Sequence, residues 1–227
     1  MTILGNPGVD FVVVVFDIDN TVYVRTDAYF NAGSENEIVE VARFLGRSVE
    51  ATRMLIKEKR QEIADRENRK AALTEAVYEL GITEQQWSDL RCCAWRPEEW
   101  LNFDEEMCGA LLRIGEVFSV VFGTNSPTEI GIRTLRALGI EEALGDFTVF
   151  GPEKLRCSKP DPCFFRRIAE LLSVDPAECI SVGDRDFSDG PPALEAGYAG
   201  AILVPGSRDE TISAIEHLMS VRHPSRR

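Results

Sequence analysis

The stretch FVVVVFDIDNT, residues 11–21, places an unbroken apolar run directly before two aspartates, Asp17 and Asp19. A run that is apolar at every position is typical of a strand buried on both faces, as in a parallel sheet covered by helices. Carboxylates at the end of such a strand need a partner, because burying an unpaired charge is costly. Residues i and i+2 of an extended chain point to the same side, so both acids can face one site.

Four further apolar runs in the second half of the chain predict more strands. They are VFSVVF at 117–122, FTVF at 147–150, CISVG at 179–183 and AGAILV at 199–204. Helical segments lie between them, and Ser126–Glu129 matches a capping box in which Ser126 would be the N-cap. Strands that alternate with helices predict an α/β fold with a doubly wound, parallel, Rossmann-like sheet.

The interval between the first two runs has no strand of comparable strength and carries helical patterns instead. Residues 34–37 form a capping box before an apolar stripe, a charged helical segment covers residues 50–70, and residues 83–86 begin another helix. We therefore predict an all-helical cap domain of residues 23–103, inserted into a core of residues 1–22 and 104–227.

The composition excludes some partners. The 227 residues include 38 acidic and 25 basic side chains, a formal net charge of −13, which argues against nucleic-acid binding. No apolar segment is long enough to cross a bilayer, so no membrane partner is expected. The six cysteines show no CxxC spacing, which favours reduced thiols in a cytoplasmic protein. The oligomeric state stays open.

Polar residues follow the predicted strands, at the edge where open α/β sheets bind their ligands. The residues with suitable chemistry there are Asp17, Asp19, Asn20, Thr21, Thr124, Asn125, Lys159, Asp184 and Asp189. Converging acids repel one another unless a cation binds, and oxygen ligands without His or Cys select Mg²⁺. A lysine and a hydroxyl beside them suit a phosphate, so the pattern indicates phosphoryl transfer on a small phosphorylated substrate.

Four segments occur in an order that resembles the signature motifs of the haloacid dehalogenase-like (HAD) hydrolase superfamily. They are DIDNT at 17–21, FGTN at 122–125, SKPDP at 158–162 and VGDRDFSD at 182–189. The position of the helical insertion, between the first and second motifs, resembles the cap of one subfamily. The resemblance implies that Asp17 is the nucleophile and Asp19 the general acid–base. The residues that would bind or orient the phosphoryl group are Asn20, Thr124, Asn125 and Lys159.

The resemblance also implies a Mg²⁺ site. Asp17, the Asp19 carbonyl and Asp184 would hold the ion, and Asp189 would support it directly or through water. Asp186 is a competing acid in the same loop. Asp189 could instead only cap the helix that begins near residue 190.

Asp19 narrows the expected activity. Dehalogenases of this superfamily lack an acid at the second position of the first motif, whereas phosphatases and phosphomutases need one to protonate an oxygen leaving group. We expect a Mg²⁺-dependent phosphatase for a small phosphate monoester, such as a nucleotide or a phosphoglycolate-type compound. A phosphomutase is the alternative within the superfamily. A phospho-accepting signalling domain of receiver type is the alternative from another class.

Overall fold

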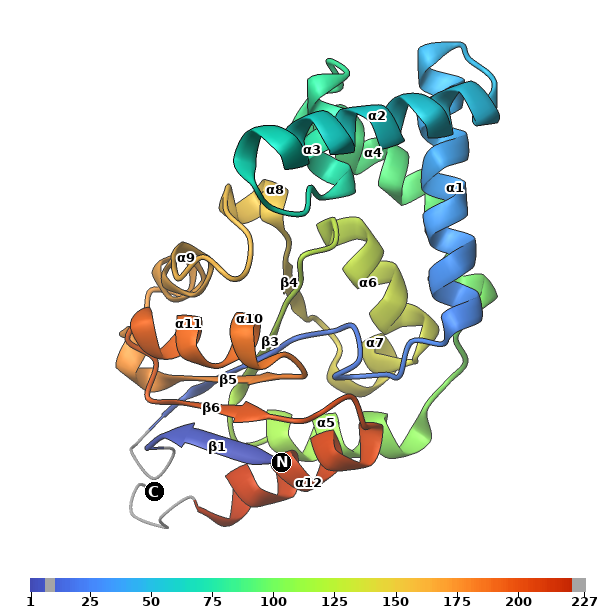
Figure 1. Ribbon diagram of the computed structural model, residues 1–227. Coiled ribbons are helices and arrows are strands. Elements are labelled where there is room, and N and C mark those ends of the chain that lie inside the picture. Colours follow the sequence, from blue (N-terminus) through green and yellow to red (C-terminus); the bar gives the residue numbers. More distant parts are fainter. Residues whose placement is uncertain (7–10, 222–227) are drawn as a thin grey trace. The chain divides into compact units, whose positions relative to one another are not determined.

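The apolar run before Asp17 forms a central strand of a six-stranded sheet in a computed structural model that describes residues 1–6 and 11–221 (Figure 1). The strand order is β1-β6-β5-β2-β3-β4, and all neighbouring pairs are parallel except β1 with β6. The strands are β1 (Thr2–Gly5), β2 (Val13–Phe16), β3 (Ser119–Gly123), β4 (Thr148–Phe150), β5 (Cys179–Gly183) and β6 (Gly200–Leu203). Every residue of β2 is buried, as the run predicted. The predicted doubly wound α/β sheet is confirmed.

The antiparallel edge strand β1 has no counterpart in the sequence prediction. It pairs with β6 in a register that sets Ile3 opposite Ile202. Three of its four residues are exposed, so it lacks the continuous apolar run that marks the buried strands. Edge strands with one partner need less apolar character, which is why the pattern misses this one.

Helices lie on both faces of the sheet, and they are connected as the alternating pattern predicts. In Figure 1, α9 and α11 lie on one side, and α5 and α12 lie on the other. The helices of this unit are α5 (Glu105–Gly115), α6 (Thr128–Ala137), α7 (Ile140–Leu144), α8 (Pro152–Leu155), α9 (Cys163–Leu172), α10 (Asp186–Asp189), α11 (Pro191–Glu195), α12 (Arg208–Ser220) and the 3₁₀ turns η1 (Pro97–Glu99) and η2 (Pro176–Glu178).

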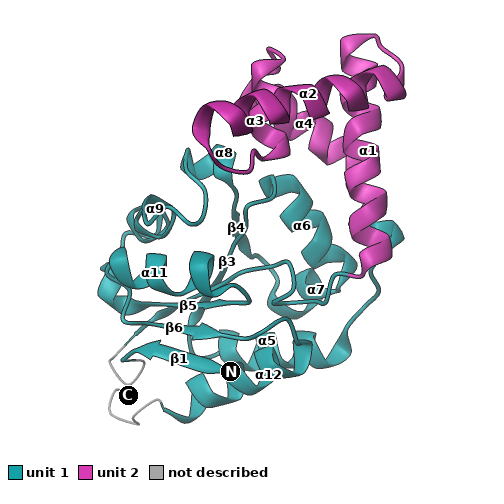
Figure 2. Ribbon diagram, viewed as in Figure 1, with its two compact units in different colours: residues 1–25, 97–227 teal, residues 26–96 magenta. Residues whose placement is uncertain are grey.

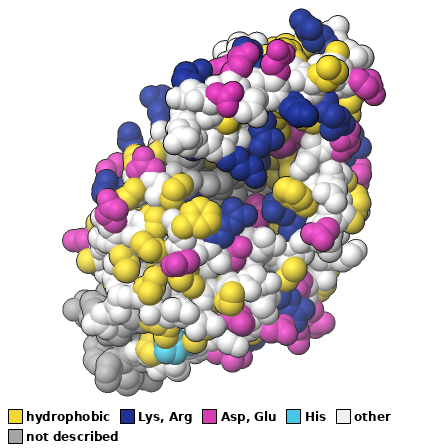
Figure 3. All heavy atoms as spheres, in the orientation of Figure 1, with side chains coloured by type: hydrophobic (Ala, Val, Ile, Leu, Met, Phe, Trp, Pro, Cys, Tyr) yellow, Lys and Arg dark blue, Asp and Glu magenta, His cyan; other side chains and the backbone are white. Residues whose placement is uncertain are grey.

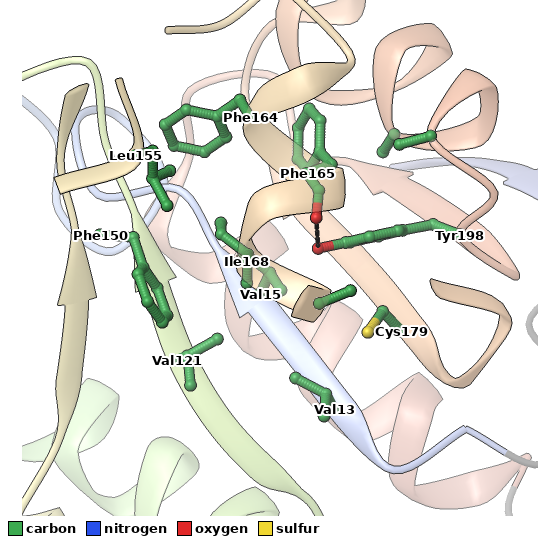
Figure 4. Close-up of a cluster of buried hydrophobic side chains, with 13 residues drawn as sticks. Val13, Val15, Val121, Phe150, Leu155, Phe164, Phe165, Ile168, Cys179 and Tyr198 are labelled. Carbon is green, nitrogen blue, oxygen red and sulfur yellow. Dashed lines mark hydrogen bonds between the residues drawn. The ribbon is translucent and has the colours of Figure 1, made fainter. Parts of the chain in front are cut away.

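A core of buried apolar side chains joins α9 to the sheet. Val13 and Val15 of β2 and Val121 of β3 pack toward Phe164, Phe165 and Ile168 of α9 (Figure 4). The Tyr198 hydroxyl donates a hydrogen bond to the Phe165 carbonyl at 3.0 Å, so the polar end of this buried ring is satisfied. This packing fixes α9, and with it the loop that precedes α9, against the strands.

The chain divides into two compact units, Met1–Arg25 with Pro97–Arg227, and Thr26–Arg96 (Figure 2). The second unit is the all-helical insertion, which we expected at residues 23–103. Residues 23–25 and 97–103 group with the sheet-containing unit instead. In that unit, Glu98 of η1 pairs with Arg133 of α6.

The helical unit consists of four helices around its own apolar core. They are α1 (Asp27–Leu45), α2 (Val49–Glu67), α3 (Leu73–Glu79) and α4 (Glu84–Ala94). Thr83 and Gln86 form the predicted capping box of α4. The expected helix start at Ser34 is wrong, because α1 begins a full two turns earlier, where the Thr26 side chain accepts from the Tyr29 amide. The core is made by Ile38, Val41, Ile56, Ile63, Ala71, Ala76, Val77, Ile82 and Trp87.

Charged side chains cover the outside of the helical unit. Figure 3 shows basic and acidic groups interspersed over it, and Arg66 pairs with Glu79 at 2.7 Å. Among the described residues, none of the helices combines the length and the apolar character that a membrane span requires. All six cysteines are free thiols.

Candidate active site

Asp17 lies at the end of β2 and is held on both sides of its carboxylate. Its backbone amide donates to the Val182 carbonyl of β5 at 2.8 Å, which continues the sheet pairing by one residue. The Lys159 ammonium donates to Asp17 Oδ1 at 2.6 Å, and the Thr21 hydroxyl donates to Oδ2 at 3.1 Å. Only 9% of Asp17 is exposed, so these donors take the place of water around the charge.

Lys159 bridges two carboxylates from different elements, Asp17 after β2 and Asp189 at the end of α10. Its ammonium donates to Asp189 Oδ1 at 2.6 Å as well as to Asp17. The other oxygen of Asp189 accepts from the Arg185 amide and the Ser188 hydroxyl, each at 3.1 Å. Asp189 therefore holds the lysine and also the backbone amide just before α10. It does not cap the helix that begins near residue 190, because α11 has Gly190 at its N-cap position and no side-chain cap. Its support of a metal ion stays a prediction.

Gly183, the last residue of β5, makes the approach of Asp189 feasible. A Cβ atom at this position would lie 2.4 Å from both Cβ and Cγ of Asp189. Such a contact is too short for any larger residue, so glycine lets the acid turn back against the strand end.

Three carboxylates gather beside one buried cation. Oxygens of Asp17, Asp184 and Asp189 all lie within 4.8 Å of one another. Lys159 contacts two of these acids, and Arg185 approaches Asp184 from the surface at 3.8 Å, with about half of its side chain exposed (47%). We call these three acids the carboxylate cluster. Negative charge exceeds buried positive charge within it, which is the arrangement that favours cation binding.

Burial and mutual repulsion perturb the ionisation of these groups. Burial raises the pKa of Asp17 to about 7; Lys159 opposes the shift, and the charge of Asp189 adds to it. Burial also raises the pKa of Asp184, against the effect of Arg185. Burial lowers the pKa of Lys159, but Asp17 and Asp189 together outweigh it, so the net shift is upward and the lysine stays charged.

Asp19 has different surroundings from Asp17. The Tyr23 hydroxyl donates to its Oδ1 at 2.5 Å, and the Ser126 hydroxyl donates to its Oδ2 at 3.4 Å. Arg25 Nη1 lies 4.0 Å from Oδ1. About a quarter of the side chain (27%) is exposed, so Asp19 is open to a ligand where Asp17 is enclosed.

The expected capping role of Ser126 is wrong. Pro127 occupies the N-cap position of α6 without a side-chain cap, and the amide of Thr128 donates to Glu153 at 2.7 Å. The Ser126 hydroxyl is directed to Asp19 instead, because the turn after β3 brings it beside the loop that follows β2.

Thr124 and Asn125 follow β3, and their side chains make different contacts. Thr124 is almost fully buried, and its Oγ1 accepts from the Ser126 amide at 3.0 Å, which leaves its own proton to donate. Asn125 makes two hydrogen bonds to the backbone of Lys159: its Oδ1 accepts from the amide at 2.9 Å, and its Nδ2 donates to the carbonyl at 2.8 Å. The side chain of Asn125 thus holds the lysine-bearing loop.

Asn20 directly follows Asp19, in the turn that leads from the two acids toward the helical unit. Its backbone has a φ of 61°, a left-handed conformation that asparagine tolerates better than most residues. Its side-chain oxygen accepts from the Arg25 amide at 3.0 Å. The side chains of Asn20 and Asn125 therefore have structural contacts of their own, and their contribution to phosphate binding stays a prediction.

A comparison with protein-family models decides the family. The model of the haloacid dehalogenase-like hydrolases matches residues 11–197, a range that contains every residue of the site described above. The chain belongs to the haloacid dehalogenase-like hydrolase family. The resemblance carried by the four motifs is thereby confirmed, and membership argues against a receiver-type signalling domain.

Solved structures with the HAD fold resemble this chain along most of its length. A 2-haloacid dehalogenase from Pseudomonas syringae pv. Tomato matches with a TM-score of 0.58 and 19% identity, covering 92% of this chain and 98% of that one. A HAD phosphatase from Thermococcus onnurineus matches with a TM-score of 0.52 and 19% identity, covering 86% of each chain. At such identities the likeness concerns the fold alone. No curated protein matches the chain by sequence.

The HAD fold brings together the side chains that the sequence motifs selected. Asp17, Lys159 and Asp189 are in direct contact, and Asp184 lies within the same cluster. Three features of the site were not predicted from the sequence. They are the hydrogen bond from Thr21 to Asp17, the hydrogen bond from Tyr23 to Asp19 and the space left by Gly183. Thr21 lies within the first motif, so its polar side chain was the available signal. The sequence carries no comparable signal for Tyr23, because only the folded turn shows that its hydroxyl reaches an acid.

Proposed function

We propose that this HAD hydrolase is a Mg²⁺-dependent phosphatase that acts on a small phosphate monoester through an aspartyl-phosphate intermediate on Asp17. The observation that carries the proposal is the second acid. Asp19 lies next to the nucleophile position, is open to a ligand, and contacts hydroxyl groups through both oxygens. A dehalogenase has no oxygen leaving group to protonate and no need of this acid.

The carboxylate cluster fits a magnesium ion. Its donors are oxygens only, with no histidine or cysteine among them, as hard cations prefer. Asp17, Asp184 and Asp189, with the Asp19 carbonyl, would hold the ion. When bound, Mg²⁺ would offset the excess negative charge and neutralise part of the incoming phosphate.

In the first half of the reaction, the Asp17 carboxylate attacks phosphorus and the bond from phosphorus to the leaving oxygen breaks. Asp19 gives its proton to that oxygen, so the product departs as an alcohol. Lys159 is fixed beside Asp17 by two ion pairs, and it stabilises negative charge on the phosphoryl oxygens. The Thr124 hydroxyl donates to the same group.

In the second half, a water molecule attacks the phosphorus of the aspartyl-phosphate. Asp19, now ionised, takes the proton from this water, and the bond between phosphorus and Asp17 breaks. Inorganic phosphate leaves, Asp17 is again a carboxylate and Asp19 is again protonated. The enzyme is thus back in its starting state: one water has been consumed, its oxygen leaves with the phosphate, and one of its protons now protonates Asp19.

The proposal is tested with the purified protein and 4-nitrophenyl phosphate. We expect release of inorganic phosphate in the presence of Mg²⁺, loss of release after EDTA, and recovery after Mg²⁺ is added back. Asp17→Asn should remain folded by circular dichroism and lose the activity. Undiminished turnover by this variant would overturn the nucleophile assignment. Release of halide from a 2-haloacid, without phosphatase activity, would overturn the proposed reaction.

A phosphomutase differs in where the phosphoryl group ends. It would return an isomeric phosphate ester instead of free phosphate. A panel of sugar phosphates, nucleotides and phosphoglycolate-type acids, analysed for both products, separates the two activities and identifies the substrate class.

A further inference from the structure

Tyr23 is the residue outside the four motifs that makes the closest contact with a proposed catalytic group. Its ring is buried, with 5% of the residue exposed, and its hydroxyl donates to Asp19 Oδ1 at 2.5 Å. A buried tyrosine hydroxyl needs a hydrogen-bond partner, and most side-chain hydrogen bonds go to the backbone or to water. The partner of Tyr23 is instead a carboxylate with a proposed catalytic role, which points to a function for this contact.

The backbone fixes Tyr23 relative to Asp19. The two residues form an isolated β-bridge, and the amide of Val22 donates to the Ile18 carbonyl at 3.0 Å, which closes the turn between them. The Thr211 hydroxyl of α12 donates to the Thr21 carbonyl at 2.7 Å and anchors this turn to the sheet-containing unit. The backbone that carries Tyr23 is therefore fixed relative to Asp19.

The two oxygens of Asp19 are unequally bound. Oδ1 accepts the short hydrogen bond from Tyr23, and Arg25 lies 4.0 Å away on the same side. Within residues 1–6 and 11–221, the hydrogen bond to Oδ2 is the longer one from Ser126 at 3.4 Å, which is near the limit for a hydroxyl donor. Oδ1 is thus engaged by fixed groups, whereas Oδ2 can exchange its contact for a substrate.

We infer that Tyr23 is a positioning residue for Asp19, which ties down Oδ1 and leaves Oδ2 as the oxygen that transfers the proton. This inference rests on the proposed phosphatase function. The Oδ2–H bond breaks as the leaving oxygen takes the proton and the bond from phosphorus to that oxygen breaks. In the hydrolytic half, Oδ2 recovers a proton from the attacking water. Tyr23 keeps its own proton throughout and touches no reacting atom.

The role predicts that loss of the hydroxyl matters most when the leaving group needs a proton. We would compare kcat/KM of the wild type and Tyr23→Phe for phenyl phosphate, a poor leaving group, and 4-nitrophenyl phosphate, a good one. This constant covers the steps up to departure of the leaving group. Tyr23→Phe should lower it for phenyl phosphate by about tenfold, a part of what acid–base catalysis supplies, and for 4-nitrophenyl phosphate by less than about twofold.

Tyr198→Phe is the matched control. Tyr198 is equally buried in the same unit, and its hydroxyl donates to a backbone carbonyl in the core, away from Asp19. Its removal should not alter the ratio of kcat/KM for the two esters. In an Asp19→Asn background, Tyr23→Phe should add little to the loss, because both changes act through the same group.

Two results would overturn the inference, and they differ from failure of the proposed function. An equal loss for both esters in Tyr23→Phe, or an additive loss in the double variant, would leave Tyr23 with a structural role only, while the phosphatase assignment stands. Absence of phosphate release by the wild type from either ester would remove the proposed function and this inference with it.

Discussion

The carboxylate cluster and the charged surface of the helical unit use the same residue types in opposite ways. On the helical unit, Arg69 pairs with Glu75, and Arg66 pairs with Glu79, with each of these side chains between 31% and 56% exposed. In the carboxylate cluster, Asp17 and Asp189 are almost fully buried, as is Lys159 beside them, and the three acids outnumber this buried cation.

The two regions differ in what their charged groups do to the stability of the folded protein. Exposed pairs are screened by water and salt, so each contributes little to stability. Buried carboxylates without enough positive charge destabilise the folded protein by several kcal/mol in general. Groups kept in such an arrangement, with raised pKa values, are typical of functional sites. The contrast makes graded predictions, because changes in the cluster should affect catalysis and changes on the helical surface should not.

Removal of the buried cation should have the largest effect. In Lys159→Met, the side chain keeps its bulk but Asp17 and Asp189 lose the ammonium that each contacts at 2.6 Å. We expect kcat/KM for 4-nitrophenyl phosphate to fall by about 10²–10³-fold, the usual result of removing one group that stabilises developing charge. Lys154→Met, a change of the exposed lysine on α8, is the control. A loss of less than threefold in Lys159→Met would contradict its place in the site.

Asp184 should set the requirement for the metal ion. In Asp184→Asn, one charged oxygen of the cluster is lost, so the Mg²⁺ concentration for half-maximal activity should rise by at least about tenfold. Isothermal titration of the protein with MgCl₂ gives a second readout that does not depend on activity. Asp186→Asn is the matched control, because Asp186 lies two residues away and is exposed. An equal effect of both changes would remove the special role of Asp184.

Asn125 should have an intermediate effect, through the lysine it holds. Asn125→Ala removes both hydrogen bonds to the Lys159 backbone, and we expect kcat/KM to fall by about tenfold, which corresponds to about 1.4 kcal/mol. Asn36→Ala removes a comparable side-chain hydrogen bond to the backbone within the helical unit, at Ala94, and should leave the activity unchanged. Equal losses in the two variants would argue that Asn125 acts only on stability.

The smallest effect should come from the exposed pair of Glu75 and Arg69. The hydrogen bond from Arg69 lowers the pKa of Glu75 from 4.5 to about 2. A lowered pKa stabilises the folded state above the unfolded value, and this contribution is lost as the pH falls through 4.5 toward 2. Glu75→Gln should shift the melting temperature at pH 7 by no more than about 2 °C, and 1 M NaCl should reduce the difference. A larger shift that resists salt would contradict the screened surface described here.

The sequence was sufficient for the parts that depend on local pattern. The apolar run before Asp17 predicted a buried central strand, and the four motifs selected the residues of the carboxylate cluster, because strand ends of a parallel sheet converge at one edge. Edge strand β1 was missed, since its exposed residues carry no continuous apolar pattern.

Contacts that depend on tertiary structure were not predictable. Ser126 matched a capping pattern, yet the fold directs its hydroxyl to Asp19 on another loop. In the sequence, Tyr23 looks like one more apolar residue of the turn, and its contact with Asp19 depends on the bridge that the two residues form in the fold. Asn125 was expected to bind phosphate, and its amide is found on the backbone of Lys159, 34 positions along the chain. In each case a local pattern leaves the partner of a polar group undetermined, and packing chooses it.

The most direct test of the central claim is to trap the phosphorylated enzyme. Asp19→Asn lacks the base that activates water, so the intermediate should accumulate when this variant turns over a ³²P-labelled aryl phosphate with Mg²⁺ and is quenched in acid. We predict label on the peptide that contains Asp17, released by hydroxylamine as an acyl phosphate is, and no label in Asp17→Asn. Label on any other residue, or turnover of the ester without a trapped intermediate on Asp17, would contradict the account.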